Sequence, residues 1–285
     1  MQIILNTTNN ATMPKYSIIT VCYNEAADIK ETLDSVVRQT SSDYEWIVVD
    51  GGSTDGTKDI LEQYASRFAW WCSEPDKGTY NAMNKGAQHA MGEYLIFMNG
   101  GDCFHDEHVL ETMSAHLSAD IVEGQALRKD NHQLLHEHDA DIIRQLLVDG
   151  INHQSVFIRR KLLLQYPYDE KYKIVADWKF WLQTLLRDRC SYAHVAIPVA
   201  DIDMTGMTYS QFATNLKERD EVLAELRSDE VLSPVAGVLR EFNYMSHNAL
   251  VQYTTYLDKN CRWGYELLRK IAKRIVRWQR KKKRL

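Results

Sequence analysis

Residues 93–102 read Glu93-Tyr94-Leu95-Ile96-Phe97-Met98-Asn99-Gly100-Gly101-Asp102, and this stretch decides the fold of the chain. It predicts a buried β-strand that runs into two glycines and a single carboxylate. A strand this apolar needs both faces covered, as in a parallel sheet flanked by helices. Such sheets bind ligands beyond the carboxyl ends of their strands, which is where Asp102 lies. Gly100 and Gly101 let the backbone approach a ligand there.

Strands and helices alternate before this stretch. We expect strands at 16–22, 46–50 and 69–72 and helices at 24–40, 57–66 and 79–91. The alternation predicts an α/β fold with a Rossmann-like, mostly parallel central sheet flanked by helices. A helix at 107–117 and a short strand near 121–122 extend it.

The pattern changes after about residue 124. We expect a polar, histidine-rich loop or ribbon at 128–139, a strand at 155–159, a helix at 177–187, a strand near 192–197 and only helices from 209 onward. This predicts a leader at 1–14, an α/β catalytic domain at 15–205 and a helical C-terminal region at 206–285.

The composition is that of an ordinary globular protein, with 285 residues, of which 45% are hydrophobic and 26% charged. No uncharged apolar stretch approaches the roughly 18 residues that would span a bilayer. Five scattered cysteines without CxxC spacing predict reduced thiols in a cytoplasmic protein, neither a disulfide framework nor a zinc site.

The net charge of −5 hides a basic tail, because residues 262–285 hold 11 lysines and arginines and one acid, Glu266. On a helix over 262–284, apolar residues fall on one side and basic residues on the other. This pattern predicts a helix lying in an anionic membrane surface. The alternative is a helix packed on the domain with a solvated basic face. The acidic remainder argues against a nucleic-acid partner.

Polar residues also follow the earlier strands. Asn24 ends the first strand, where it could cap a helix or lie beside a ligand. Asp50 ends the second strand, and its carboxylate could accept the imide N–H of uracil or a ribose hydroxyl. Lys77 lies before a predicted helix, where a cation suits phosphate, although a solvated loop lysine is the alternative. A carboxylate such as Asp102 beside a nucleotide diphosphate suits Mg²⁺ or Mn²⁺, whereas a solvated turn aspartate would have no such role.

Four segments together resemble the motifs of family 2 glycosyltransferases, in the same order and spacing. They are Ile19–Glu25, Val48–Gly56, Glu74–Gly78 and Asn99–Asp102. The resemblance covers roughly residues 15–200. It implies a GT-A fold, a nucleoside-diphosphate-sugar donor, Mn²⁺ or Mg²⁺, and inversion at the anomeric carbon. It is closest to the bacterial type that adds sugars to surface polysaccharide or lipopolysaccharide precursors.

The resemblance also implies roles for single residues. The donor site would include Thr20, Tyr23, Glu25, Asp50, Lys77, Gly78 and Gly101, with Asp50 at the base and Lys77 near the ribose or phosphates. Asp102 would bind the metal. Asn99 and Gly101 stand where the family often has aspartate, so one protein carboxylate remains and we expect weak metal binding without donor.

An inverting transfer needs a general base for the acceptor hydroxyl. Asp177 matches the catalytic acidic position of the family, although helix capping is the alternative role. His153, Gln154 and Trp178 are expected on the acceptor side, with a buried, hydrogen-bonded histidine as the alternative for His153. For the further histidines we favour a solvated or acceptor-facing loop over a metal site; they are His132, His136 and His138.

The leading hypothesis is an inverting, metal-assisted hexosyl- or N-acetylhexosaminyltransferase that uses a UDP-sugar and a glycan or lipid-linked acceptor. We expect it in the cytoplasm, on the inner leaflet of a bacterial plasma membrane. One alternative is a sugar-nucleotide nucleotidyltransferase, which would carry a glycine-rich loop after the first strand, where Cys22–Glu25 has none. Another is a non-catalytic nucleotide-binding scaffold.

Overall fold

The computed structural model describes residues 13–135, 138, 145–146, 150–204, 211–234, 236–237 and 240. By its internal contacts the chain divides into two compact units, Met1–Val222 and Leu223–Leu285. The expected leader up to residue 12, His136 and the basic segment 262–284 lie outside the described residues.

The first unit is built on an eight-stranded sheet with the order β3-β2-β1-β4-β7-β6-β8-β5. Its parallel half consists of β1 (Tyr16–Cys22), β2 (Tyr44–Asp50), β3 (Trp70–Ser73) and β4 (Tyr94–Phe97). These strands confirm the predicted, mostly parallel sheet. Their runs are buried or half-buried because helices cover both faces.

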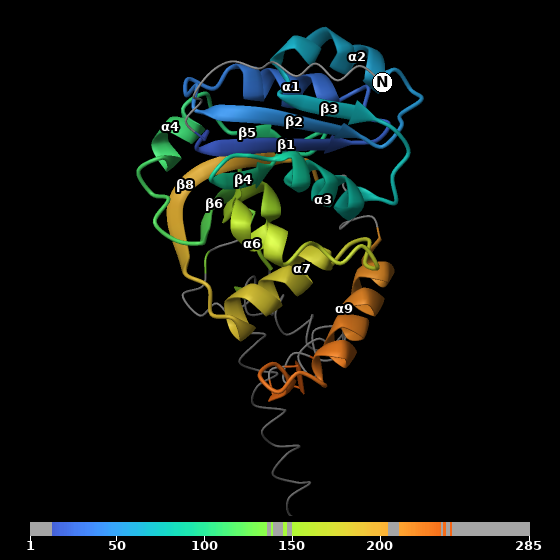
Figure 1. Cartoon of the computed structure of the whole chain (residues 1–285), viewed down its shortest axis with the longest axis vertical. Coiled ribbons are helices and arrows are strands. Elements are labelled where there is room, and N and C mark those ends of the chain that lie inside the picture. The colour runs from blue at the N-terminus through green and yellow to red at the C-terminus, as the bar shows by residue number, and fades with distance from the viewer. Residues whose placement is uncertain are drawn as a thin grey trace, which may run out of the picture. The chain divides into compact units, whose positions relative to one another are not determined.

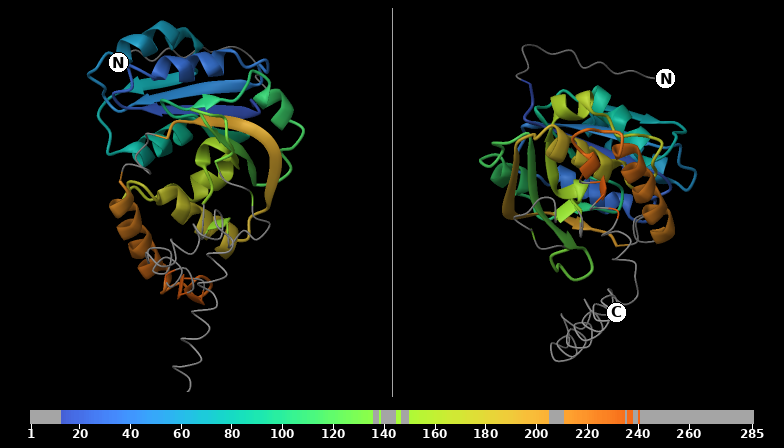
Figure 2. Two further views of the ribbon diagram at one scale, coloured as in Figure 1. Left: turned by 180° about the vertical axis from the view of Figure 1, so that it is seen from behind. Right: turned by 90° about the horizontal axis from the view of Figure 1, so that it is seen from below.

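The other half of the sheet is mixed. β7 (Val156–Arg159) runs antiparallel to both β4 and β6 (Ile121–Arg128). β8 (Tyr192–Ile202) is parallel to β6 and antiparallel to the two-residue strand β5 (Cys103–Phe104). β8 is longer than predicted and curls along the sheet in each view (Figures 1 and 2).

Helices α1 (Ile29–Val37) and α2 (Thr57–Tyr64) lie on one face of the sheet, and α3 (Thr79–His89) lies on the other (Figure 1). A short 3₁₀ turn (Ala65–Arg67) follows α2, and α4 (Val109–Met113) follows β5. α1 begins five residues later than predicted. The reason is Asn24, whose φ of 54° ends the strand in a left-handed turn.

Alternate residues of β1 point to opposite faces of the sheet. Ile18 packs in the cluster that holds Leu33 of α1 and Leu61 of α2. Ile19 points to the opposite face, where a Cβ at Gly86 would lie 2.5 Å from its Cγ2 atom. Gly86 is therefore the residue that lets α3 approach the sheet closely.

Four more helical segments follow β7 among the described residues. They are α6 (Arg160–Gln165), which was not predicted, α7 (Ala176–Trp181), a π-helical segment (Leu182–Arg187) and α9 (Phe212–Leu226). A 3₁₀ turn (His153–Ser155) precedes β7. The predicted ribbon is a short hairpin in its described part, because Leu127 pairs with Leu134.

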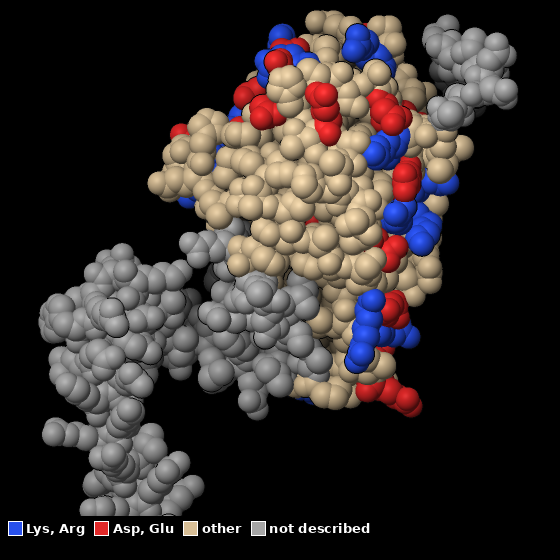
Figure 3. Space-filling model, turned by 90° about the vertical axis from the view of Figure 1, so that its left-hand side faces the viewer, with Lys and Arg blue, Asp and Glu red and all other residues tan. Residues whose placement is uncertain are grey.

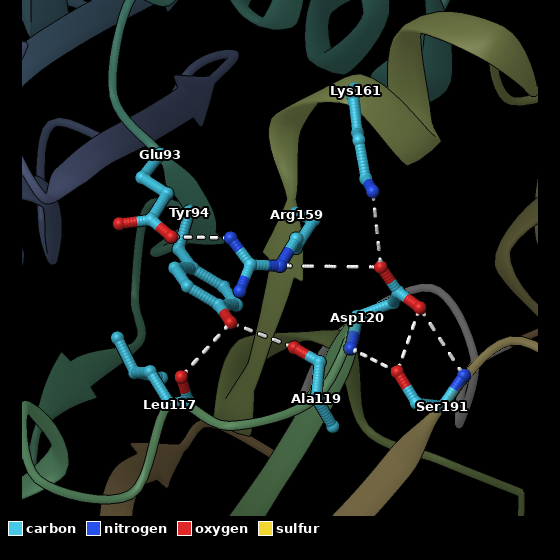
Figure 4. Close-up of polar contacts among 8 residues, drawn as sticks. All are labelled: Glu93, Tyr94, Leu117, Ala119, Asp120, Arg159, Lys161 and Ser191. Atoms are coloured by element: carbon cyan, nitrogen blue, oxygen red, sulfur yellow. Dashed lines mark hydrogen bonds and ion pairs between the residues drawn. The ribbon is translucent and has the colours of Figure 1, made fainter.

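A polar cluster closes the opposite end of the sheet (Figure 4). The guanidinium of Arg159 lies 4.6 Å above the Tyr94 ring and pairs with Glu93. Asp120 accepts from the Ser191 hydroxyl at 2.7 Å. This cluster ties β4, β7, β6 and β8 together at the end away from the carboxyl ends of β1 and β4.

The side on which α4 and β8 lie in Figure 1 has a broad uncharged area, with acidic and basic side chains interspersed along its margins (Figure 3). Among the described residues, no helix combines the length and the apolarity needed to cross a bilayer.

Candidate active site

A cleft of about 910 Å³ opens beyond the carboxyl ends of β1 and β4. Nine of the residues singled out from the sequence line it, namely Tyr23, Glu25, Lys77, Gly78, Asp102, His153, Gln154, Asp177 and Trp178. They come from strand ends, the start of α3, the turn before β7 and α7. Residues up to 155 positions apart thus share one hollow.

Asp102 is buried at the floor of this cleft, with 5% of its surface exposed. Its Oδ2 accepts from the Gln154 amide at 3.0 Å, and its Oδ1 accepts from the backbone N–H of Asp203 at 3.0 Å. Burial raises the pKa of Asp102 to about 6. The carboxylate is therefore held in place, but its charge is costly without a cation nearby.

The surroundings of Asp102 fit a divalent cation. Burial first, and then the charges of Asp28, Asp203 and Asp102, raise the pKa of Glu25 to about 7. Several carboxylates thus repel one another in a partly desolvated place, and a hard cation would relieve that repulsion. Asp203 is an acidic neighbour that the sequence did not suggest, because it follows β8 and lies 101 positions from Asp102.

Asp177, at the start of α7, is held by three groups. Its Oδ1 accepts from the Tyr80 hydroxyl and from the backbone N–H of Trp178, each at 2.8 Å. Its Oδ2 lies 3.1 Å from Nδ1 of His153. Only 16% of the Asp177 side chain is exposed, yet it lines the cleft. The carboxylate is oriented and remains accessible to a ligand.

His153 connects Asp177 to the motif at the end of β4. Its Nε2 lies 3.0 Å from the Asn99 amide nitrogen, which can only donate, so Nε2 accepts and Nδ1 carries the proton toward Asp177. The Oδ1 atom of Asn99 is buried without a partner among the described residues. A ligand hydroxyl in the cleft could satisfy this oxygen.

The opposite wall is the start of α3. The φ of Gly78 is +120°, which side-chain-bearing residues rarely adopt, and its N–H donates to Oδ1 of Asp76 at 2.8 Å. Lys77 is exposed, and its ammonium makes no ion pair within the described part of the chain. A free cation at the N-terminus of an eleven-residue helix suits an anionic ligand.

Three expected donor residues do not line the cleft. Thr20 is fully buried, and its hydroxyl accepts from the Trp46 indole N–H at 3.0 Å. Asp50 is also fully buried, and its carboxylate accepts from the Ser73 hydroxyl at 2.6 Å and from the Ser53 backbone N–H at 3.1 Å. Both side chains hold strands and loops behind the wall, and neither lines the cleft in this structure, contrary to the expected direct contact with a ligand.

Gly101 is the third of these. Its φ is +94°, and its N–H donates to the Thr32 hydroxyl at 3.1 Å, away from the cleft lining. It shapes the turn that delivers Asp102. In contrast, Tyr23 lines the cleft and is 60% exposed. Its ring could therefore stack on a ligand.

The expected histidine loop separates into two places outside this cleft. His132 joins His105 and Asp201, with ligand atoms that all lie within 4.8 Å of one another, so these three residues could hold a transition-metal ion. His138 stacks on His194 at 3.8 Å. His132 and His138 therefore do not share one site, and His136 lies outside the described residues.

Helix α9 also reaches the Asp177 segment, which the sequence did not reveal. The buried carboxylate of Glu218 accepts the backbone N–H groups of Lys173 at 3.0 Å and Ile174 at 2.9 Å. Arg219 lines the cleft beside Trp178. The sequence did not indicate a role for Glu218 and Arg219, because adjacent charged residues on a helix are usually exposed to solvent.

Comparison with known proteins gives one family match and several relatives. The family model described as Glycosyl transferase family 2 matches residues 17–163. A "PGL/p-HBAD biosynthesis glycosyltransferase" of Mycobacterium bovis is 36% identical over 176 residues, which cover 59% of this chain and 68% of that protein. An uncharacterized glycosyltransferase of Mycobacterium tuberculosis is 31% identical over 203 residues, covering 68% of this chain and 77% of that protein.

Solved structures of similar fold include S. aureus TarS 1–349 in complex with UDP-GlcNAc. It has a TM-score of 0.64 at 18% identity, with 85% of this chain and 75% of that chain covered. This chain covers 45% of a longer TarS chain. The mannosyltransferase PcManGT from Pyrobaculum calidifontis, in complex with GDP-Man and Mn²⁺, has a TM-score of 0.64 at 16% identity, with 93% and 81% covered.

Proposed function

The chain belongs to glycosyl transferase family 2 and has the GT-A fold, and we propose that this glycosyltransferase inverts the anomeric carbon as it transfers. The donor in this proposal is a nucleoside-diphosphate-sugar, with a UDP-sugar favoured. The acceptor is a hydroxyl of a glycan or of a lipid-linked sugar in bacterial surface polysaccharide biosynthesis.

One observation carries the proposal: Asp102 and Asp177 face the same cleft, and neighbouring residues connect them. Gln154 bonds Asp102 and His153 bonds Asp177. A metal-binding carboxylate and an oriented base on one hollow are what a single displacement at an anomeric carbon requires.

In this mechanism Asp177 takes the proton from the acceptor hydroxyl as that oxygen attacks. Tyr80 and His153 keep the carboxylate in position. Lys77 and the first turn of α3 lie near the donor diphosphate and stabilise its developing charge. Asp102 would hold Mn²⁺ or Mg²⁺, which when bound supplies Lewis-acid stabilisation of the leaving diphosphate.

The assignment of donor and metal is also supported by related proteins. Structural neighbours were solved with UDP, with UDP-GlcNAc, and with GDP-Man and Mn²⁺. Tyr23 at the mouth of the cleft offers a ring for the base, and Glu25 lies close to the acidic floor.

The membrane part of the proposal depends on the segment 262–284, which lies outside the described residues. On a helix, its apolar and basic residues would fall on opposite sides, a sequence pattern that supports peripheral attachment to an anionic leaflet, close to a lipid-linked acceptor. Deletion of 262–285 should abolish co-sedimentation with anionic vesicles. Unchanged sedimentation would rule this attachment out.

The donor assignment can be tested by thermal unfolding with UDP, GDP or TDP, each with and without Mn²⁺. A ligand at one hundred times its Kd stabilises a protein by about 2.7 kcal/mol. We expect UDP with Mn²⁺ to raise the Tm most. If no nucleoside diphosphate shifts the Tm, the proposed function is wrong.

A further inference from the structure

Arg219 is a cation in the cleft that forms no direct ion pair with another described residue. Its side chain is half-buried, and its Nε is shielded from solvent without a hydrogen-bond acceptor among the described residues. No ion pair of this guanidinium occurs within the part of the chain that the structure describes. An unpaired, partly desolvated charge is costly, so such a group is usually completed by a ligand.

The guanidinium is nevertheless held in a defined place. Its central carbon lies 4.8 Å from the centroid of the Trp178 ring, in cation–π contact. Its Nη2 atom lies 4.0 Å from the position of a Cβ at Gly150, so the backbone there leaves room beside it. Burial lowers the pKa of Arg219 and the charge of Asp177 raises it, but an arginine remains protonated in proteins. The site is a fixed positive charge open to the cleft.

The neighbours of Arg219 locate it relative to the reaction. Along the cleft wall, Asp102 contacts Gln154, the adjacent His153 contacts Asp177, and the adjacent Trp178 contacts Arg219. The base thus lies between the metal-binding carboxylate and Arg219 in this series of contacts.

An in-line displacement puts the leaving diphosphate and the attacking hydroxyl on opposite sides of the anomeric carbon. The diphosphate belongs with Asp102 and Lys77, and the hydroxyl belongs with Asp177. A group that follows Asp177 in the series of contacts that starts at Asp102 therefore faces the acceptor. On the basis of the proposed function, we infer that Arg219 binds an oxyanion carried by the acceptor, either a sugar carboxylate or a phosphate, close to the hydroxyl that receives the sugar.

Planar, forked donors such as guanidinium bind carboxylate and phosphate with two parallel hydrogen bonds. Because Nε is shielded from solvent, the two Nη nitrogens at the end of the side chain provide such a fork where Arg219 lines the cleft. The inference narrows the acceptor class from any glycan hydroxyl to an anionic acceptor. Lysine, which lacks the fork and the planar stacking surface, should replace Arg219 only in part.

The test uses the full chain with its donor site filled by UDP and Mn²⁺. Glucuronate and inorganic phosphate are then titrated separately by calorimetry or ligand-observed NMR. We expect wild type to bind at least one of them, Arg219→Gln to bind it about tenfold or more weakly, and Arg219→Lys to fall between the two. Arg38→Gln, at an exposed arginine outside the cleft, is the matched control and should bind as wild type does.

The two probes distinguish the source of the oxyanion: tighter glucuronate points to an acidic glycan, and tighter phosphate points to a phosphate-bearing acceptor. If Arg219→Gln weakens UDP binding and leaves the second anion unaffected, Arg219 serves the donor and the inference is overturned. It is also overturned if wild type binds UDP with Mn²⁺ but neither anion, a result that leaves the proposed function standing. Retained UDP binding by Arg219→Gln confirms that this variant is folded.

Discussion

The imidazole of His153 holds Asp177 in a fixed orientation, with Nδ1 3.1 Å from the carboxylate Oδ2. The other ring nitrogen rests on Asn99, so the histidine cannot turn without losing both contacts. Catalytic carboxylates depend on such support, because small misplacements cost large factors in rate.

Removing this support should slow the reaction without weakening the donor complex. We expect His153→Ala to lower kcat about tenfold or more and to leave the Kd for UDP with Mn²⁺ near that of wild type. His89→Ala is the control, since His89 stacks on Trp70 outside the cleft. A change confined to UDP affinity would show that His153 serves the donor and does not position Asp177.

Substitution of the proposed base gives a sharper result. Asp177→Asn keeps the shape of the side chain but cannot accept a proton, so donor turnover should fall by about 10²–10⁴. Release of nucleoside diphosphate from the sugar donor measures this, and UDP binding should persist. Asp59→Asn, at an exposed position on α2, is the matched control. Wild-type turnover by Asp177→Asn would exclude the base role.

Asp102→Asn should raise the stability of the metal-free protein and weaken its metal binding. In the folded protein the pKa of Asp102 is about 6, above its unfolded value, so its buried negative charge at pH 7.5 lowers the free energy of unfolding. Without metal, the variant should be more stable by on the order of 2 kcal/mol. Mn²⁺ with UDP should raise the Tm of wild type and raise that of the variant much less. An equal shift in both proteins would place the metal elsewhere.

Glu123 offers a pH test outside the cleft. Burial raises its pKa to about 7 and the bond from Tyr192 opposes this. The native state therefore holds a proton that the unfolded chain releases near pH 4.5, so this group makes stability fall as pH rises from about 4.5 to about 7. Urea unfolding at pH 5 and pH 8 should show a decline in wild type that Glu123→Gln reduces by up to about 3 kcal/mol. Identical pH profiles would mean that Glu123 ionises normally.

Thr20 should contribute to the free energy of unfolding and not to the affinity for the donor nucleotide. Thr20→Val leaves the Trp46 indole N–H buried without an acceptor, which costs about 1–3 kcal/mol. Denaturant unfolding measures the loss, while the UDP affinity should stay unchanged. Thr40→Val, at an exposed threonine, is the control. A selective loss of UDP affinity would restore the sequence-based role of Thr20.

The parallel half of the sheet was predictable because its signals are local. Each of its strands is a short apolar run with a polar loop after it, as at 44–50 and 94–97. The direction of β7 and the existence of β5 depend on pairing with distant strands, and a two-residue strand has no periodicity to detect.

The motifs predicted the cleft but not the orientation of every side chain around it. Thr20 and Asp50 stand in the right motifs, yet both turn into the protein, because side chains alternate across a strand. Asp203 and Arg219 join the cleft from residues far along the chain, after the last strand. Only the folded structure brings such residues to the strand ends.

The two walls of the cleft come from different stretches of the chain. The wall that we assign to the donor is formed by residues between 21 and 102, whereas the other wall is formed by residues from 150 onward, including α7 and the first turns of α9. Substitutions in one wall can therefore change what that wall binds without altering the other wall. Under the proposed function, we therefore expect relatives that use different acceptors to differ mainly after residue 150.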